Sequence, residues 1–461
     1  MTQDIPSAAR TCRVAVVGAG AAGLTAVKEL TEAGLEAVGF ERRERPGGLW
    51  VRDPEGNASP AYASLHLNTS RGRTEFAAHP MPADWPDYPS ADLVAGYLDD
   101  YARRFGLYDR IRFGVEVTRV ERGQDGDGWL VTADGGTERF DAVVVANGHH
   151  HDPRWPDPAY PGDFTGEQMH AHDYQDADTF DGRRVLVVGL GNSAVDIAVD
   201  ASHRAEGPVL LSSRRGAYVI PKYLFGRPAD ATNGALSGLP WRLRQRISEA
   251  ALRLAVGRPE AYGLPKPDRG LLESHPTVSD TLLHRLTHGE VAHRPGIARF
   301  DGDQVVFTDG RRDTVDLVVW ATGYRVTVPF LDDRWLGTGP EELLLHHRVF
   351  HLDDPTLCFV GLMQSTGAAF PVVEAQSRLV ADVLSGRACL PTPGEQRADA
   401  ERALRASTER WGGDRRPAMR IDFDGYLAET AAVRRAAVDR ARAGQGVRVR
   451  VAAPRTIGEE R

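Results

Sequence analysis

Short valine-rich runs followed by glycine turns divide the chain into two similar units. The clearest runs are residues 13–17 and 185–188. The turns that follow them are Gly18-Ala19-Gly20-Ala21-Ala22-Gly23 and Gly189-Leu190-Gly191-Asn192-Ser193-Ala194. A buried strand, a tight glycine turn and a helix start place backbone N–H groups and a helix N-terminus against a pyrophosphate. The pattern therefore predicts two dinucleotide-binding units, and two dinucleotides suggest electron transfer between them.

The alternation of polar and apolar positions predicts the rest of the first unit. We expect a helix at 23–33 that stops at Gly34, a helix at 93–102, and strands at 115–120, 129–132 and 140–145. Residues 57–89 are irregular and rich in Pro, Asp and Ser. A loop of that length in a compact protein is more often functional than idle, so we expect it to contribute to a site.

A second amphipathic pattern lies within the second unit, at residues 241–256. Its apolar stripe consists of Leu243, Ile247, Ala250 and Leu254. Such a stripe is typical of a helix that packs on a core or lines a substrate channel, and this is our expectation. Contact with a membrane is the alternative, which the neighbouring arginines do not establish by themselves.

The residues that end the strand after each turn distinguish the two ligands. Glu41 closes the run 37–40, and a carboxylate there accepts hydrogen bonds from ribose hydroxyls and repels a 2′-phosphate, which fits FAD. The run 209–211 instead leads to Ser213 and Arg214, with no acid. Hydroxyl and guanidinium groups suit a 2′-phosphate, so NADPH fits the second unit better than NADH.

Length, composition and charge exclude several classes of protein. At 461 residues the chain is too long for one typical core. The net charge of -8 and the pI near 6.0 argue against a nucleic-acid partner. Residues 1–7 show no secretory signal, and no apolar run approaches the ~18 residues that span a bilayer. The abundance of arginine over lysine suggests a bacterial source, and we expect a cytoplasmic protein.

Cysteine and histidine usage argues against two further kinds of site. The three cysteines, Cys12, Cys358 and Cys389, are far apart and form no CxxC pair, so a dithiol relay to a flavin is not expected. The run 149–151 consists of three histidines without helical spacing or an acidic partner. We interpret it as a polar turn and expect no metal.

A motif between the two turns identifies a family. Residues 164–174 contain Phe164, Gly166, His170 and Tyr174 in the pattern FxGxxxHxxxY. With this motif the chain resembles the flavin-containing monooxygenases, the class that also holds the Baeyer–Villiger monooxygenases. The resemblance covers nearly the whole chain, and its other motifs occur in the expected order: Gly48-Leu49-Trp50, Leu67-Asn68-Thr69-Ser70, Ala321-Thr322-Gly323-Tyr324 and residues 359–364.

The resemblance implies a fold and a reaction. The fold class is α/β with two Rossmann-like domains, the NADPH domain being inserted into a discontinuous FAD domain. We place the first part of the FAD domain at 1–175, the NADPH domain at 176–320 and the second part at 321–461. FAD and NADPH are the implied cofactors, and a flavin C4a-hydroperoxide would oxygenate a small-molecule substrate with O2. The family also suggests a homodimer.

The resemblance assigns roles to matching positions. Asn68 would lie at the flavin edge, although from the residue alone it is an ordinary loop-capping amide. His170 would act at the domain junction, as a hinge or supporting residue more than as a direct acid or base. The expected cofactor-binding residues are Gly18, Gly20, Ala21, Ala22, Gly23, Glu41, Gly48, Leu49, Trp50, Thr69, Val117, Gln364, Gly189, Gly191, Asn192, Ser193, Ala194, Ser213, Arg214, Thr322 and Gly323.

The end of the motif bears on the reaction type. Baeyer–Villiger enzymes usually carry Trp followed by Pro or Asp where this chain has Tyr174 and Gln175. This resembles the branch that oxidises nitrogen or sulfur. Ketone oxygenation stays open, because it needs a cation near the flavin and Arg71, Arg73 and Arg325 are available. A flavin oxidase or reductase is the second alternative.

Overall fold

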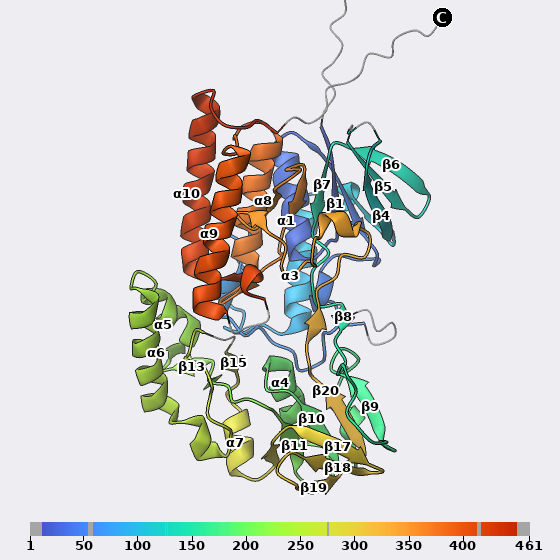
Figure 1. Cartoon of the computed structure of the whole chain (residues 1–461), viewed down its shortest axis with the longest axis vertical. Helices are drawn as coiled ribbons and strands as arrows, with labels where there is room; N and C mark the ends of the chain where they lie inside the picture. Colours follow the sequence, from blue (N-terminus) through green and yellow to red (C-terminus); the bar gives the residue numbers. More distant parts are fainter. Residues whose placement is uncertain are drawn as a thin grey trace, which may run out of the picture.

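The structure is a computed structural model that describes residues 12–53, 59–124, 126, 128–273, 276–412 and 416–449. The chain forms two α/β units, with the C-terminal helices beside the upper unit in Figure 1. Each unit is built around a largely or wholly parallel sheet, which confirms the expected fold class. The expectation about a secretory signal concerns residues 1–7, which lie outside the described residues.

The first sheet has seven strands in the order β22-β23-β24-β7-β1-β2-β3. Its parallel strands are β24 (Leu357–Phe359), β7 (Ala142–Val145), β1 (Arg13–Val17), β2 (Glu36–Glu41) and β3 (Ile111–Phe113), and the antiparallel extension is β22 (Leu345–His346) and β23 (Phe350–His351). Strand β24 pairs with β7, more than 200 residues earlier in the chain. The first domain is therefore built from both ends of the chain, as expected.

Alternate side chains of β1 enter two different layers. Val14 and Val16 belong to a core that includes Leu24 and Leu98, from helices α1 (Ala21–Glu32) and α3 (Ala91–Arg104), and extends to α8 (Phe370–Leu384). Val17 packs with Trp129 on the other face, in the antiparallel sheet of β4 (Val117–Arg122), β5 (Trp129–Ala133) and β6 (Gly136–Phe140). A strand covered on both faces is a continuous apolar run, which is the pattern seen in the sequence.

The second sheet repeats this arrangement in five parallel strands. They follow the order β16 (Val291–Arg294), β11 (Val209–Ser212), β10 (Val185–Val188), β20 (Leu317–Trp320) and β9 (Glu167–His170). Val187 packs with residues of helix α4 (Asn192–Ala201). Leu186 packs on the other face, against the three-stranded sheet of β17 (Ile297–Asp301), β18 (Gln304–Phe307) and β19 (Arg312–Thr314).

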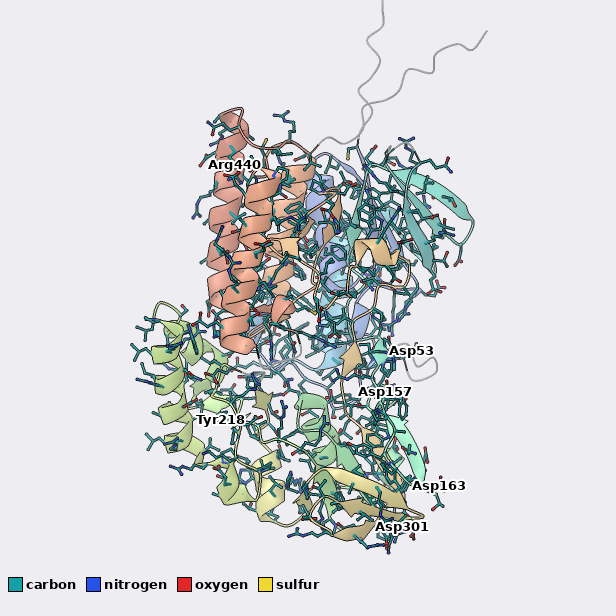
Figure 2. The ribbon with its side chains drawn as sticks, viewed as in Figure 1. Asp53, Asp157, Asp163, Tyr218, Asp301 and Arg440 are labelled. Atoms are coloured by element: carbon teal, nitrogen blue, oxygen red, sulfur yellow. The ribbon has the colours of Figure 1, made fainter. Side chains whose placement is uncertain are left out.

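Two linkers cross side by side between the domains. Strand β8 (Asp152–Pro153) of the outgoing linker pairs antiparallel with β21 (Tyr324–Arg325) of the returning one. The amide of Arg154 donates to the Gly323 carbonyl at 3.0 Å. Figure 2 shows Asp157 at this level and Asp301 on the outer sheet far below it. Because β9 lies in the second sheet, we propose residues 149–157 as the first domain boundary in place of residue 175.

Two helices follow α8 at the C-terminal side. They are α9 (Pro393–Trp411) and α10 (Phe423–Arg442), and Figure 1 shows both beside α8. Helix α9 begins with a capping box, in which Thr392 and Glu395 exchange hydrogen bonds with each other's backbone amides. The second domain carries an insertion with α5 (Ala229–Ala235), α6 (Trp241–Val256) and α7 (Leu282–Thr287). None of the helices in the described ranges is long and apolar enough to cross a membrane.

The packing expected for residues 241–256 is wrong, although α6 has the expected bounds. Leu243, Ile247 and Leu254 are 47%, 39% and 82% exposed. The buried side chains of the helix are instead Arg244 and Leu252. Leu252 packs against Leu271 and Leu272, and Arg244 pairs with Asp422 of α10. The ion pair thus selects the inward face, and the apolar stripe of the sequence faces outward.

Candidate active site

The first glycine turn is closed so tightly that side chains do not fit. Gly18 has φ +105°, and a Cβ there would lie 2.5 Å from the Ala146 carbonyl oxygen. A Cβ on Gly23 would lie 1.8 Å from the Gly18 carbonyl oxygen. The turn therefore brings backbone, rather than side chains, to the N-terminus of α1, which is the shape that a pyrophosphate requires.

The second glycine turn of this domain packs directly on the first. A Cβ on Gly48 would lie 2.9 Å from the Gly20 Cα. Arg43 fixes this turn, because its Nη1 donates to the Gly48 carbonyl at 2.5 Å. Trp50 packs edge-on against Phe370 of α8, with 6.4 Å between ring centroids. The expected residues of 18–23 and 48–50 thus form one surface, and Arg43 is a member that the sequence analysis missed.

Glu41 ends β2 beside the same turn, as expected. Its Oε2 accepts the amide N–H of Ala19 at 2.7 Å, and its Oε1 accepts that of Arg43 at 3.0 Å. A carboxylate has about four acceptor positions, so it keeps capacity for ribose hydroxyls. Val117, the expected adenine contact, begins β4 close by, where Val115 donates its amide to the Glu41 carbonyl at 2.9 Å.

The glycine turn of the second domain has the same construction. Gly189 has φ +140°, and a Cβ there would lie 2.6 Å from the Ala321 carbonyl oxygen and 3.2 Å from the Ala194 Cβ. Gly191 and Ser193 are exposed at the start of α4, which leaves the helix N-terminus open. The Asn192 side chain accepts the Val278 amide at 2.8 Å. Asn192 therefore holds the insertion against the turn, a contact that the sequence did not suggest.

Ser213 and Arg214 follow β11 at the position expected for a 2′-phosphate. The Ser213 hydroxyl lies 2.9 Å from Nε2 of His293, which the neighbouring strand β16 supplies. Burial lowers the pKa of His293. Arg214 is exposed and makes no ion pair within the described part of the chain. Its guanidinium is therefore available to an anionic ligand.

His170 lies at the crossing of the linkers. It ends β9, pairs in register with Trp320, and is 1% exposed. Its ring lies 5.9 Å from that of Trp155 and 5.5 Å from that of Tyr324. Burial lowers the pKa of His170 to about 4, outweighing the opposite effect of Asp173. The imidazole is neutral at pH 7, which suits a residue that packs the junction better than one that donates protons.

The other residues of the FxGxxxHxxxY motif also join parts of the chain. Tyr174 is fully buried, and its hydroxyl donates to Asp200 of α4 at 2.7 Å. Tyr62, in the loop expected at 57–89, donates to Asp196 of the same helix at 2.7 Å. This loop thus docks on the NADPH-domain helix and brings Asn68 and Thr69 to the domain boundary. Residues 57 and 58 of the expected loop lie outside the described residues.

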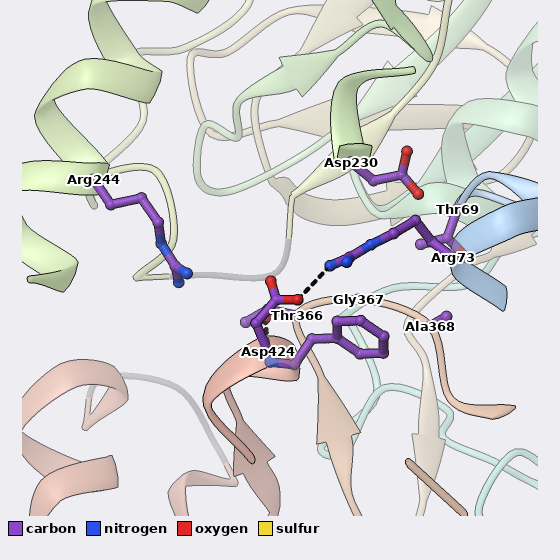
Figure 3. Close-up of a pocket in the computed structure, with 9 residues that line it drawn as sticks. Thr69, Arg73, Asp230, Arg244, Thr366, Gly367, Ala368 and Asp424 are labelled. Atoms are coloured by element: carbon purple, nitrogen blue, oxygen red, sulfur yellow. Dashed lines mark hydrogen bonds and ion pairs between the residues drawn. The ribbon is translucent and has the colours of Figure 1, made fainter. Parts of the chain in front are cut away.

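A pocket lies beside Asn68, where four segments of the chain meet. It is lined by Thr69 and Arg73, by Asp230 and Arg244 of the insertion, and by Thr366–Ala368 with Phe423 and Asp424 (Figure 3). Gln364 lies two residues before Thr366, in strand β25 (Gln364–Ser365). This strand pairs with β26 (Arg420–Ile421). The side chain of half-buried Asn68 makes no hydrogen bond with any described residue. Its amide is therefore available to a bound molecule.

Comparison with known proteins decides the family. The sequence profile described as "FMO-like: Flavin-binding monooxygenase-like" matches residues 11–439. The chain belongs to this family. Flavin-containing monooxygenase 5 of Rattus norvegicus is 35% identical over 440 residues, covering 91% of this chain and 82% of the relative. Flavin-containing monooxygenase 3 of the same species is 33% identical over 447 residues, with the same coverage. The protein is a flavin-dependent monooxygenase.

Solved structures show the same architecture. S-allyl-L-cysteine S-oxygenase from Allium sativum superposes with a TM-score of 0.68 at 27% identity, covering 95% of this monooxygenase and 94% of that chain. The open form of cyclohexanone monooxygenase has a TM-score of 0.70 at 21% identity, covering 93% and 98%. At 21% identity, the likeness to cyclohexanone monooxygenase shows a shared fold.

The description of the family shows that this monooxygenase binds a flavin, and the glycine turns of the two domains fit FAD and NADPH. In each of these turns an added Cβ would overlap backbone atoms, at Gly18 and Gly23 in the first and at Gly189 in the second. Glu41 is suited to a free ribose and Arg214 to a phosphorylated one. The structure also brings Thr322 and Gly323 to the linker crossing, while Leu49 is 39% exposed on its turn. Among the described residues, no group of three or more His, Cys, Asp and Glu could hold a metal ion.

Proposed function

We propose that this monooxygenase transfers one atom of O2 to a nitrogen or sulfur atom of a small organic substrate, with NADPH as the reductant. For a thioether, a sulfur lone pair forms the new S–O bond, the O–O bond breaks, and the second oxygen leaves as water. NADPH supplies the two electrons and, with one proton from solvent, the hydrogens of that water. FAD, when bound, passes the electrons on and activates O2.

The observation that carries this proposal is the position of Asn68. Its amide has no hydrogen-bond partner among the residues that the structure describes. It lies next to Thr69, which lines the pocket, and the pocket also contacts the loop that follows Gln364. An amide N–H donates a hydrogen bond without releasing its proton, unlike a carboxylic acid. Asn68 can therefore orient a reactive oxygen and leave its proton in place.

The names of the relatives support oxidation of a heteroatom. The Allium sativum protein is an S-oxygenase by name, and a further relative, from Rattus norvegicus, is named dimethylaniline monooxygenase (N-oxide-forming) 2 and is 32% identical over 450 residues. Tyr174, at the end of the FxGxxxHxxxY motif, also supports the branch that oxidises nitrogen or sulfur. A dithiol reductase is not supported, because it needs a pair of cysteines, and Cys358 and Cys389 are both free thiols.

Baeyer–Villiger oxygenation of a ketone is the second candidate, and one residue favours it. Of the three arginines available from the sequence, Arg73 lines the pocket. Arg71 instead donates to the Pro82 carbonyl at 2.8 Å, and Arg325 pairs with Asp152 at 2.9 Å. Arg73 is paired with Asp424, which compensates its charge and makes it a weaker partner for an anionic oxygen.

Replacement of Asn68 by aspartate tests the proposed role. We expect Asn68→Asp to keep its FAD and to divert O2 to free H2O2, with product per NADPH falling about tenfold or more, because a hydrogen bond to a charged group contributes roughly 1.5–3 kcal/mol. The control is Gln304→Glu, the same chemical change on strand β18 of the outer sheet. An unchanged ratio of product to H2O2 in Asn68→Asp would remove Asn68 from the reaction.

The location, source and assembly of the enzyme are also proposals. Free thiols at Cys358 and Cys389 support a reducing compartment such as the cytoplasm. The arginine-rich composition supports a bacterial source. A homodimer rests on the family resemblance, and light scattering of the purified protein tests it.

A further inference from the structure

The loop that carries Asn68 precedes the NADPH domain in sequence, yet side chains of that domain fasten it. Ahead of Asn68, the Tyr62 hydroxyl donates to Oδ2 of Asp196 at 2.7 Å. The Ser64 hydroxyl donates to Asp200. Both carboxylates belong to α4, four residues apart and thus on one face of that helix. The loop is therefore attached to the helix whose N-terminus follows the second glycine turn.

A second attachment follows Asn68 in the chain. The amide and the hydroxyl of Ser70 both donate to Oδ2 of Asp230, at 2.7 and 2.9 Å. Asp230 lies in helix α5 of the insertion, and Ser70 is buried. Hydrogen bonds to a carboxylate are stronger than those between neutral groups. Asn68 thus lies between two attachments, and both of them are to the NADPH domain.

The ring of Tyr62 is embedded in the core of the NADPH domain. It is buried with Val195 and Ile197 of α4, and its centre lies 5.4 Å from that of the Tyr174 ring. Burial raises the pKa of the Tyr62 hydroxyl well above its ordinary value, and the charge of Asp196 acts in the same direction. The hydroxyl therefore keeps its proton and stays a donor at neutral pH.

The FAD domain contacts the same loop through Leu67. This side chain is buried in the core that includes Leu98 of α3, and its amide donates to the Pro89 carbonyl at 3.0 Å. Asn68 follows Leu67 directly, so it lies where the loop passes from one domain to the other. Its own amide makes no hydrogen bond within the described residues. The position of Asn68 therefore depends on the attachments of its neighbours.

We propose that Tyr62 and Ser70 are positioning residues for Asn68. Tyr62 acts through Asp196 and Ser70 through Asp230, so that the NADPH domain holds Asn68 in place. The inference rests on the proposed function, because it explains how Asn68 keeps the position assigned to it there. If the loop is released, O2 forms no bond to the substrate. It takes a hydride equivalent from NADPH and one proton from solvent, and leaves as H2O2.

Tyr62→Phe tests the positioning, because it removes the hydroxyl and leaves the ring in the core. We expect the ratio of H2O2 to sulfoxide, measured with butyl methyl sulfide, to rise about tenfold. FAD content and the KM for NADPH should change less than about twofold. The control is Tyr108→Phe, whose hydroxyl donates to Asp99 within the FAD domain and whose loss should leave the ratio as in the parent. A parental ratio in a folded Tyr62→Phe variant would overturn the inference.

The second attachment gives an independent variant. Ser70→Ala removes the hydroxyl bond to Asp230 and keeps the amide bond, so the ratio of H2O2 to sulfoxide should rise about threefold to tenfold. This variant decides the matter if Tyr62→Phe does not fold, and a parental ratio in it would then overturn the inference.

A double variant shows whether Tyr62 acts through Asn68. Once Asn68 is replaced, a positioning residue has nothing left to position. The ratio of H2O2 to sulfoxide in Tyr62→Phe with Asn68→Asp should therefore equal that of Asn68→Asp alone, within about twofold. A further tenfold rise in the double variant would show that Tyr62 acts by a separate route and would overturn the inference.

Hydrogen exchange distinguishes failure of this inference from failure of the proposed function. The amides of residues 63–70 should exchange about tenfold faster in Tyr62→Phe than in the parent, and at the parental rate in Tyr108→Phe. If exchange is faster but the parent forms no sulfoxide, the attachment of the loop stands and the proposed function is contradicted. If the parent forms sulfoxide but exchange in Tyr62→Phe is parental, only the positioning is contradicted.

Discussion

At the scale of the residue, single atoms decide whether the cofactor turns can form. The position of Gly23 leaves no room for a methyl group, because backbone oxygen lies 1.8 Å from where the Cβ would be. Neither Gly18 nor the start of α1 can move away easily, since β1 lies inside the sheet. The third glycine of the motif thus serves close packing of helix on strand.

We predict that Gly23→Ala loses FAD. The purified variant should retain less than about a tenth of the FAD per protein, measured by flavin absorbance, because the turn must open to admit the methyl group. Gly96→Ala is a matched control in helix α3, where no atom lies within 4 Å of the added Cβ. It should keep its FAD and gain up to about 1 kcal/mol of helix stability. Full FAD content in Gly23→Ala would refute the packing argument.

We propose that Arg214 determines the choice of nicotinamide cofactor. Its guanidinium is exposed just after β11, where a 2′-phosphate is expected. We predict that Arg214→Ala raises the KM for NADPH roughly tenfold to a hundredfold, as expected for loss of a charge-assisted bond, and that for NADH less than about twofold. Steady-state kinetics with both cofactors measures this. Equal changes in the two KM values would exclude a contact with the 2′-phosphate.

At the scale of the element, local patterns predicted much and distant pairings were missed. The bounds of α6 agree with the predicted 241–256, since amphipathic period is a local property. The contact of Ser213 with His293 depends on β16 pairing with β11, 80 residues apart in sequence. The inward face of α6 depends on an ion pair with Asp422, 178 residues away. Neither the contact with His293 nor the ion pair with Asp422 leaves a signal in the sequence near Ser213 or α6.

The two faces of α6 give a matched pair of leucines. Leu252 is 5% exposed and Leu254 is 82% exposed. We predict that Leu252→Ala destabilises the helix by about 2–5 kcal/mol, the usual cost of a buried leucine. Leu254→Ala should change its stability by less than about 0.5 kcal/mol. Amide hydrogen exchange of α6 measures both. Greater loss of protection in Leu254→Ala would show that the sequence-predicted face is the buried one.

At the scale of the whole molecule, two domains of the same design meet at one junction. In each, a parallel sheet has helices on one face and a three-stranded antiparallel sheet on the other. The β8–β21 pairing and the loop held by Tyr62 join them. The repeated motif predicted both domains, whereas the pocket could not be predicted because its lining comes from residues 69–73, 230–244, 366–368 and 423–424.

The central claim is that this molecule places one atom of O2 on its substrate at the expense of NADPH. Turnover of butyl methyl sulfide under ¹⁸O2, followed by mass spectrometry of the product, tests it most directly. We predict a sulfoxide that carries one ¹⁸O atom, formed only in the presence of NADPH. NADPH consumption matched entirely by H2O2, with no labelled sulfoxide, would contradict the account and indicate an oxidase.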